Sequence, residues 1–142
     1  MESSSLEIRL NRLDRVYRPN ERVEGVVVVN AYKGWSHSGI QIEVEGLIFL
    51  SHNNRGMVGI RGDLGNRPTV ILKTNFLAIP AGKFPDGTTE VPFDFPVQPI
   101  AGQQLYESYH GVYVSVVYII QAICDRGVMK KSLQKEMEFL VE

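Results

Sequence analysis

The sequence has a single cysteine, Cys124, so it cannot form an internal disulfide framework. That cysteine lies in a long apolar stretch, where a thiol behaves as a small buried hydrophobe, and a reducing compartment fits this usage best. Residues 1–5 lack the basic and apolar regions of a signal peptide, and no apolar run approaches the roughly 20 residues that a membrane-spanning helix needs. These absences predict a cytoplasmic protein with no direct membrane insertion.

An excess of charge of either sign is also missing. The 15 basic residues nearly balance the 16 acidic ones, for a formal net charge of -1. Binding to nucleic acid requires a basic face that neutralises phosphates, so we expect no nucleic-acid partner. The one modest basic cluster combines Met129 with Lys130, Lys131 and Lys135. We interpret it as a solvated strand end, with an anionic surface as the alternative.

The sequence carries no catalytic, metal or cofactor motif. None of its three histidines, His37, His52 and His110, belongs to a triad pattern, and we interpret the first two as surface residues. His-x-His and Cys-x-x-Cys spacings are absent, as is a glycine-rich turn that opens a helix for a phosphate. We therefore predict a protein that is not an enzyme and that binds no cofactor. A sugar-binding or hydrolytic module that uses Tyr32, Trp35 and surface carboxylates remains an alternative.

Period-two alternation of apolar residues is the main secondary-structure signal. Leu6, Ile8 and Leu10 alternate with charged residues, which predicts a first strand with one buried face. Four consecutive valines at 26–29 are stiff and β-branched, which predicts a central strand over 23–30. Further strands are expected at 40–50, 69–79, 90–95 and 112–124.

Proline and glycine mark the breaks between these strands. We expect a turn at 18–21, a loop at 33–39, a bulge or bend at Gly46 and an edge position for the strand that contains Pro92. The polar stretch 51–68 predicts a mobile or functional loop. Residues 133–141 fit a helix or a strand, and we favour a strand after a hairpin turn at 125–127.

About seven short strands without a long helix predict an all-β fold. The expected architecture is a two-sheet antiparallel, immunoglobulin-like β-sandwich, with a partly closed barrel as the alternative. The length of 142 residues suits one hydrophobic core. No repeat or shift in composition divides the chain, so we expect a single domain over 1–142.

A distinctive run of ten residues leads into the long apolar strand. Positions 105–114 read Leu-Tyr-Glu-Ser-Tyr-His-Gly-Val-Tyr-Val and include Tyr106, Glu107, Tyr109, His110 and Gly111. This run is similar to a hallmark of the arrestin-like subunits of the endosomal sorting complexes retromer and retriever.

A second segment, upstream of the first, resembles the same family. Positions 82–93 read Gly-Lys-Phe-Pro-Asp-Gly-Thr-Thr-Glu-Val-Pro-Phe and include Gly82, Pro85, Gly87, Glu90 and Pro92. Residues 16–18, 24–28 and 40–46 also agree with the family pattern, and the detail is closest to the retriever member. The stretch 51–68 departs from the pattern.

The resemblance implies an arrestin-like sandwich that acts as the N-terminal lobe of a bilobal scaffold. Such scaffolds join a solenoid subunit and a phosphoesterase-like subunit on endosomes, and they retrieve membrane-protein cargo with sorting nexins. We therefore expect a role in protein transport and recycling, peripheral on endosomes through a complex. The motif residues are expected to be structural rather than contact residues, because glycine and proline there set backbone angles and stop strands. His110 is expected to supply or bridge a partner for a buried tyrosine hydroxyl.

One alternative keeps the fold but changes its use. An arrestin-related adaptor would bind the tails of cargo proteins by adding a peptide strand to a sheet edge.

Overall fold

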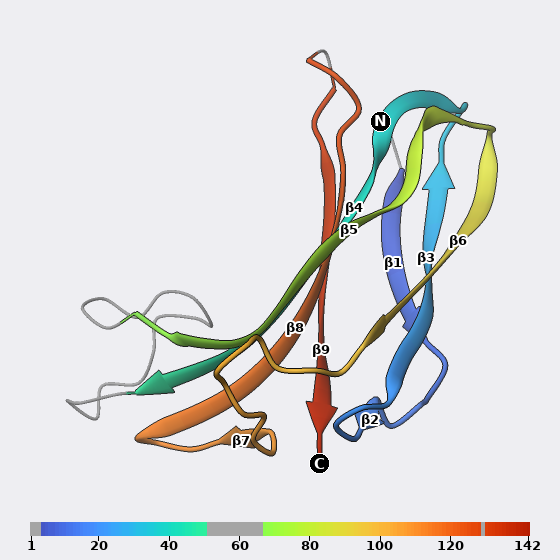
Figure 1. Cartoon of the computed structure of the whole chain (residues 1–142). Coiled ribbons are helices and arrows are strands. Elements are labelled where there is room, and N and C mark those ends of the chain that lie inside the picture. Colours follow the sequence, from blue (N-terminus) through green and yellow to red (C-terminus); the bar gives the residue numbers. More distant parts are fainter. Residues whose placement is uncertain (1–3, 51–66, 129) are drawn as a thin grey trace.

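The computed structural model describes residues 4–50, 67–128 and 130–142, and these residues form nine strands (Figure 1). The strands are β1 Ser5–Leu10, β2 Val16–Tyr17, β3 Arg22–Ala31, β4 Trp35–Leu50, β5 Thr69–Phe84, β6 Gly87–Pro96, β7 Tyr109–His110, β8 Val114–Cys124 and β9 Leu133–Val141. No helix occurs in the part of the chain that the structure describes.

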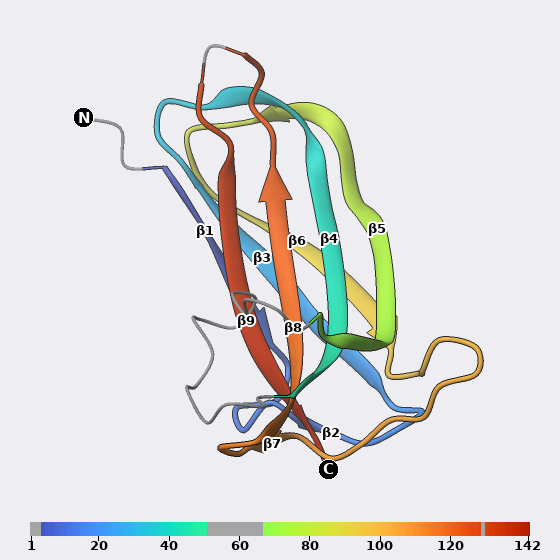
Figure 2. The same cartoon turned by 90° about the vertical axis from the view of Figure 1, so that its left-hand side faces the viewer.

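The strands form two facing sheets. The smaller has the order β1-β3-β6, and the larger has the order β2-β9-β8-β4-β5, with β7 paired to one end of β8. Figures 1 and 2 show the two sheets as separate layers that pack face to face. All ladders are antiparallel except that between β2 and β9. The predicted all-β, two-sheet sandwich is confirmed.

The alternation seen in the sequence builds the core between the sheets. Leu6 and Ile8 of β1 are buried, as are Val27 and Val29 of β3. β3 lies at the centre of its sheet, as its valines predicted. From the other side, the even-numbered residues of β8 from Val116 to Cys124 belong to the same core. β9 confirms the strand prediction for the C-terminal segment.

Gly46 and Pro92 occupy the bulge and the edge strand that the sequence predicted. The β4–β5 register shifts between Gly46 and Leu47, which confirms the predicted bulge. A Cβ atom on Gly46 would stand 2.7 Å from ring carbons of Tyr118, so the buried ring requires glycine there. β6, which contains Pro92, is an edge strand, where a missing N–H is tolerated.

Several predicted boundaries were wrong. The loop expected at 33–39 is a tight turn, because β4 already begins at Trp35, and β5 continues past Pro80 to Phe84. β8 begins at Val114 rather than Val112, which is exposed. The connection from β8 to β9 spans 125–132, longer than the expected hairpin turn.

The larger sheet carries a second, smaller apolar cluster. Val117 and Ile119 of β8 pack there with Leu47 and Phe49 of β4. The loop predicted over 51–68 lies mainly outside the described residues, as do His52 and Met129.

Candidate interaction surface

Residues 106–111 bridge the ends of two core strands. The backbone N–H of Ser108 donates to the carbonyl of Val141 at 2.8 Å, and the N–H of Val141 donates to the Ser108 hydroxyl at 2.9 Å. The next two residues form β7, in which Tyr109 pairs with Val116 and His110 with Ser115 of β8. The segment therefore ties the start of β8 to the end of β9.

A buried hydroxyl anchors the front of this segment. Tyr118 of β8 has no exposed surface, and its hydroxyl donates to the Tyr106 carbonyl at 2.6 Å and accepts from the Tyr106 N–H at 3.2 Å. Burial raises the pKa of Tyr118. The expectation that His110 would serve such a hydroxyl was wrong, because the Nε2 atom of His110 lies 2.6 Å from Oε2 of Glu138.

Large side chains of this segment and of the two residues that follow it face solvent. Tyr106, Tyr109, Val112 and Tyr113 are between 48% and 63% exposed, and we call these four residues the aromatic strip. Glu107 is exposed beside them. The backbone of the segment is thus committed to the fold, whereas its large side chains are available for contact with another molecule.

The second motif segment, 82–93, comprises the end of β5, the turn at 85–86 and the first part of β6. Asp86 accepts a hydrogen bond from the Lys33 N–H at 2.7 Å, which joins this turn to the one between β3 and β4. Gly87 has a φ of 110°, a left-handed value that favours glycine. Glu90 forms an exposed ion pair with Arg9 at 3.3 Å. Pro85 lies within the turn itself.

The same end of the sandwich holds an aromatic cluster that includes His37. The sequence suggested that His37 is a surface residue, but it is only 7% exposed and its ring stacks on Phe84 with centroids 4.0 Å apart. Its Nδ1 atom accepts the Gly39 N–H at 2.9 Å. Burial lowers the pKa of His37, which favours the neutral ring. Gly82 lies nearby, since a Cβ atom there would come 3.8 Å from Nε2 of His37.

Trp35 belongs to this cluster and is unsuitable as a sugar platform. Its indole is buried, packs edge-on against Phe84, and carries the Arg126 guanidinium 4.8 Å from the ring centroid. The indole N–H donates to the Ser4 hydroxyl at 3.0 Å. A stacking platform needs an open ring face, so this part of the carbohydrate-binding alternative was wrong.

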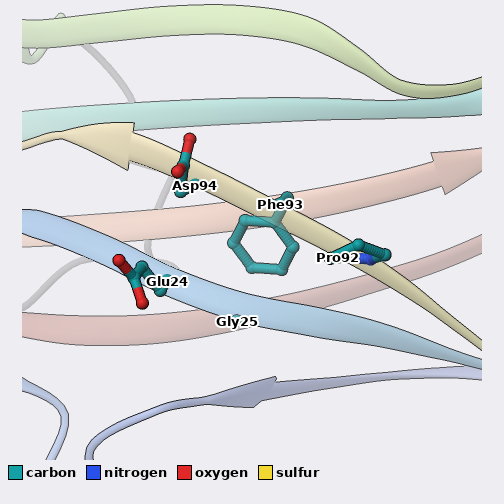
Figure 3. Close-up of a pocket in the computed structure, with 5 residues that line it drawn as sticks. All are labelled: Glu24, Gly25, Pro92, Phe93 and Asp94. Atoms are coloured by element: carbon teal, nitrogen blue, oxygen red, sulfur yellow. The ribbon is translucent and has the colours of Figure 1, made fainter.

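An open depression lies between β3 and β6. Figure 3 shows its lining by Glu24, Gly25, Pro92, Phe93 and Asp94, with the Phe93 ring turned toward the Gly25 backbone. The two carboxylates stand opposite each other in the ladder. A carboxylate pair that hydrolyses glycosides needs one member in an apolar, water-poor setting. Asp94 instead is half exposed and paired with Arg22 at 2.9 Å, so the depression does not resemble such a site.

Among the described residues, no cluster of three or more His, Cys, Asp or Glu side chains is arranged to hold a metal ion. In the same ranges, no helix is long and apolar enough to span a membrane. Cys124 is buried and free, and burial raises the pKa of its thiol to about 11.

Comparison with known proteins gives consistent matches. The model of the family described as "Vacuolar protein sorting-associated protein 26" matches residues 7–142. A curated relative, "Vacuolar protein sorting-associated protein 26C" of Dictyostelium discoideum, is 37% identical over 139 residues, which are 96% of this chain and 46% of that protein.

Among solved structures, the sporulation control protein Spo0M of Bacillus subtilis is similar over all of this chain and 50% of its own, with a TM-score of 0.66 and 12% identity. At that identity the likeness concerns the fold alone. The chain thus spans about half the length of the proteins that it matches.

Proposed function

The chain belongs to the Vacuolar protein sorting-associated protein 26 family, with its arrestin-like fold, and on that premise we propose that it is a non-catalytic scaffold lobe of an endosomal cargo-retrieval complex. The family resemblance noted in the sequence is confirmed. The observation that carries the proposal is the match over residues 7–142, which includes both motif segments.

Two observations favour a complex of the retriever type over retromer. The relative at 37% identity is named as the 26C member, and the motif detail is also closest to the retriever subunit. In this proposal the chain is the N-terminal lobe, and its partners are a solenoid subunit, a phosphoesterase-like subunit, sorting nexins and cargo tails. The protein would recycle membrane proteins from the cytoplasmic side of endosomes.

The geometry suits a scaffold. Two sheets share one continuous core, and the motif backbone locks β8 to β9, which yields a stiff body. The aromatic strip lies on that stiff body, so a partner that buries it would lose little conformational freedom. We propose the strip as a contact surface of the assembled complex.

Affinity purification of the full-length protein from cells tests the proposal. We expect the solenoid and phosphoesterase-like subunits to be recovered together by mass spectrometry. A variant with Tyr109→Ser and Tyr113→Ser removes half of the strip, and Leu77→Ser, an equally exposed apolar residue on β5, serves as the control. Recovery of neither subunit with the unaltered protein would refute the assignment; equal recovery with the strip variant would refute the contact surface alone.

A second candidate is a cargo adaptor that binds peptides by strand addition. The position of β5 at the edge of the larger sheet favours it, because an edge strand presents backbone groups to an incoming strand. Titration with cargo-tail peptides, followed by amide shifts, would then perturb β5 selectively. Shifts that are absent from β5 would exclude this mode.

A further inference from the structure

Three turns meet at one end of the sandwich and carry an excess of positive charge. Figure 1 shows the β3–β4, β5–β6 and β8–β9 connections at the same end of the molecule. Together with the last residues of β5 they contain two acidic side chains, Asp86 and Asp125. They also contain five basic ones, which we call the basic end: Lys33, Lys83, Arg126, Lys130 and Lys131.

Packing around Trp35 holds these turns together. The Arg126 guanidinium lies over the indole and donates to the Lys131 carbonyl at 2.9 Å. Lys83 stands in the residue pair next to Trp35–Phe84 in the β4–β5 ladder. The Ser38 N–H donates to the Asp125 carbonyl at 2.9 Å, which ties β4 to the β8–β9 connection. The turns that carry the cations are therefore held together at one end of the sandwich.

The opposite end of the sandwich has no such excess of positive charge. The turns at 11–15 and 18–21 carry three arginines and two acidic residues, and Glu107 and Glu142 close by bring the total to three basic and four acidic residues. Arg12 is also paired with Glu21 at 2.8 Å. A chain with a net charge of -1 is thus electrically asymmetric, and an anionic surface would attract it by the basic end.

The shape of the basic end suits a surface better than a peptide groove. Figures 1 and 2 show the described parts of the β8–β9 connection, on either side of residue 129, projecting beyond the other two turns. Val128 on this connection is 100% exposed and stands between Arg126 and Lys130, and Tyr32 of the β3–β4 turn is half exposed. Exposed apolar side chains flanked by cations are typical of loops that rest in a lipid headgroup layer.

We propose that the basic end docks electrostatically on an anionic lipid bilayer, with Val128 at the level of the headgroups and no segment crossing the membrane. A lysine or arginine near such a surface raises the binding constant about fivefold. Five cations opposed by two acids would bind weakly, so the contact would orient an assembled complex rather than recruit a lone chain. The proposal does not rest on the identity of the complex.

Vesicle co-sedimentation of the purified protein tests the proposal. Vesicles of phosphatidylcholine with roughly a third phosphatidylserine are expected to bind, and pure phosphatidylcholine vesicles are not. Substituting Lys130→Gln together with Lys131→Gln should lower the binding constant about 25-fold. The matched control, Arg15→Gln with Arg18→Gln, has the same net charge and should bind like the unaltered protein. High salt should abolish binding.

Equal losses in the two double variants would overturn the proposal, because net charge alone would then explain binding. Binding to polyglutamate or RNA without binding to vesicles would also overturn it, and would assign the basic end to another polyanion. Circular dichroism of both variants checks that they are folded. Affinity purification of the Lys130 and Lys131 variant should still recover the partner subunits, which separates this test from that of the proposed function.

Discussion

Substituting Tyr118→Phe should loosen the front of the motif segment, at Tyr106, while leaving the core almost fully packed. The hydroxyl of Tyr118 makes two hydrogen bonds to the backbone of Tyr106, at 2.6 and 3.2 Å. Tyr118 itself has no exposed surface. Each bond contributes about 1 kcal/mol, and both backbone groups lose their partner, so we expect a loss of about 2 kcal/mol. For a chain of this length, that loss lowers the melting temperature by roughly 7 °C.

The matched control is Tyr17→Phe. Tyr17 is equally buried, but its hydroxyl donates to the side chain of Asn11 at 2.7 Å, and that exposed amide can turn to water. We expect a loss of about 1 kcal/mol, half that of Tyr118→Phe, in urea unfolding. Amide exchange should accelerate at Tyr106 and Ser108 in the Tyr118 variant only. Equal losses, or unchanged exchange at Tyr106, would refute the anchoring role of the hydroxyl.

Three further outcomes follow from single residues. Gly46→Ala, which sets a Cβ atom against the Tyr118 ring, should lower the free energy of unfolding in urea by about 1–3 kcal/mol. Gly82→Ala, whose new Cβ atom has its nearest neighbour at 3.8 Å, should leave that free energy almost unchanged. Similar losses in the two variants would contradict the packing argument. Burial holds the pKa of His37 below 6.5, so the unfolded chain binds more protons than the folded one, and stability should fall as the pH drops below about 6.5. His37→Gln should flatten this pH dependence of the melting temperature in thermal scans. An unchanged dependence would contradict the role assigned to His37. Cys124, with a thiol pKa of about 11, should react with a thiol reagent only in denaturant, and rapid reaction of the native protein would show that it is accessible.

The strands with strong alternation could be predicted from the sequence because their side chains meet one large core. β1 follows this rule, β3 was predicted from its run of β-branched valines, and the bulge at Gly46 was visible as a glycine inside an apolar strand. The two-residue strands β2 and β7 could not be predicted. Their pairing depends on neighbours distant in sequence rather than on any local pattern.

The candidate surface was only partly readable in the sequence. The motif at 105–114 contains the segment that packs against β8 and β9, but nothing local indicates that Tyr118, rather than His110, anchors its backbone. His37 was misjudged because serines and glycines around it suggest a loop. β4 begins earlier than that pattern implies, because Trp35 packs against Phe84 and pairs with it in the β4–β5 ladder. Residues 36–39 therefore belong to the strand.

The basic end illustrates the same limit. Lys130 and Lys131 were visible as a modest cluster, whereas Lys33 and Lys83 are far from them in the sequence and join them only through the fold. A cluster interpreted as a solvated strand end thus becomes part of a wider charged surface.

Reconstitution from purified components tests the scaffold assignment most directly. The full-length protein would be mixed with the solenoid and phosphoesterase-like subunits, without any cargo peptide, and analysed by size-exclusion chromatography with mass determination. We predict one ternary complex with equal amounts of each subunit. Separate elution of this protein, together with peptide-induced shifts confined to β5, would contradict the scaffold role and support a cargo adaptor instead.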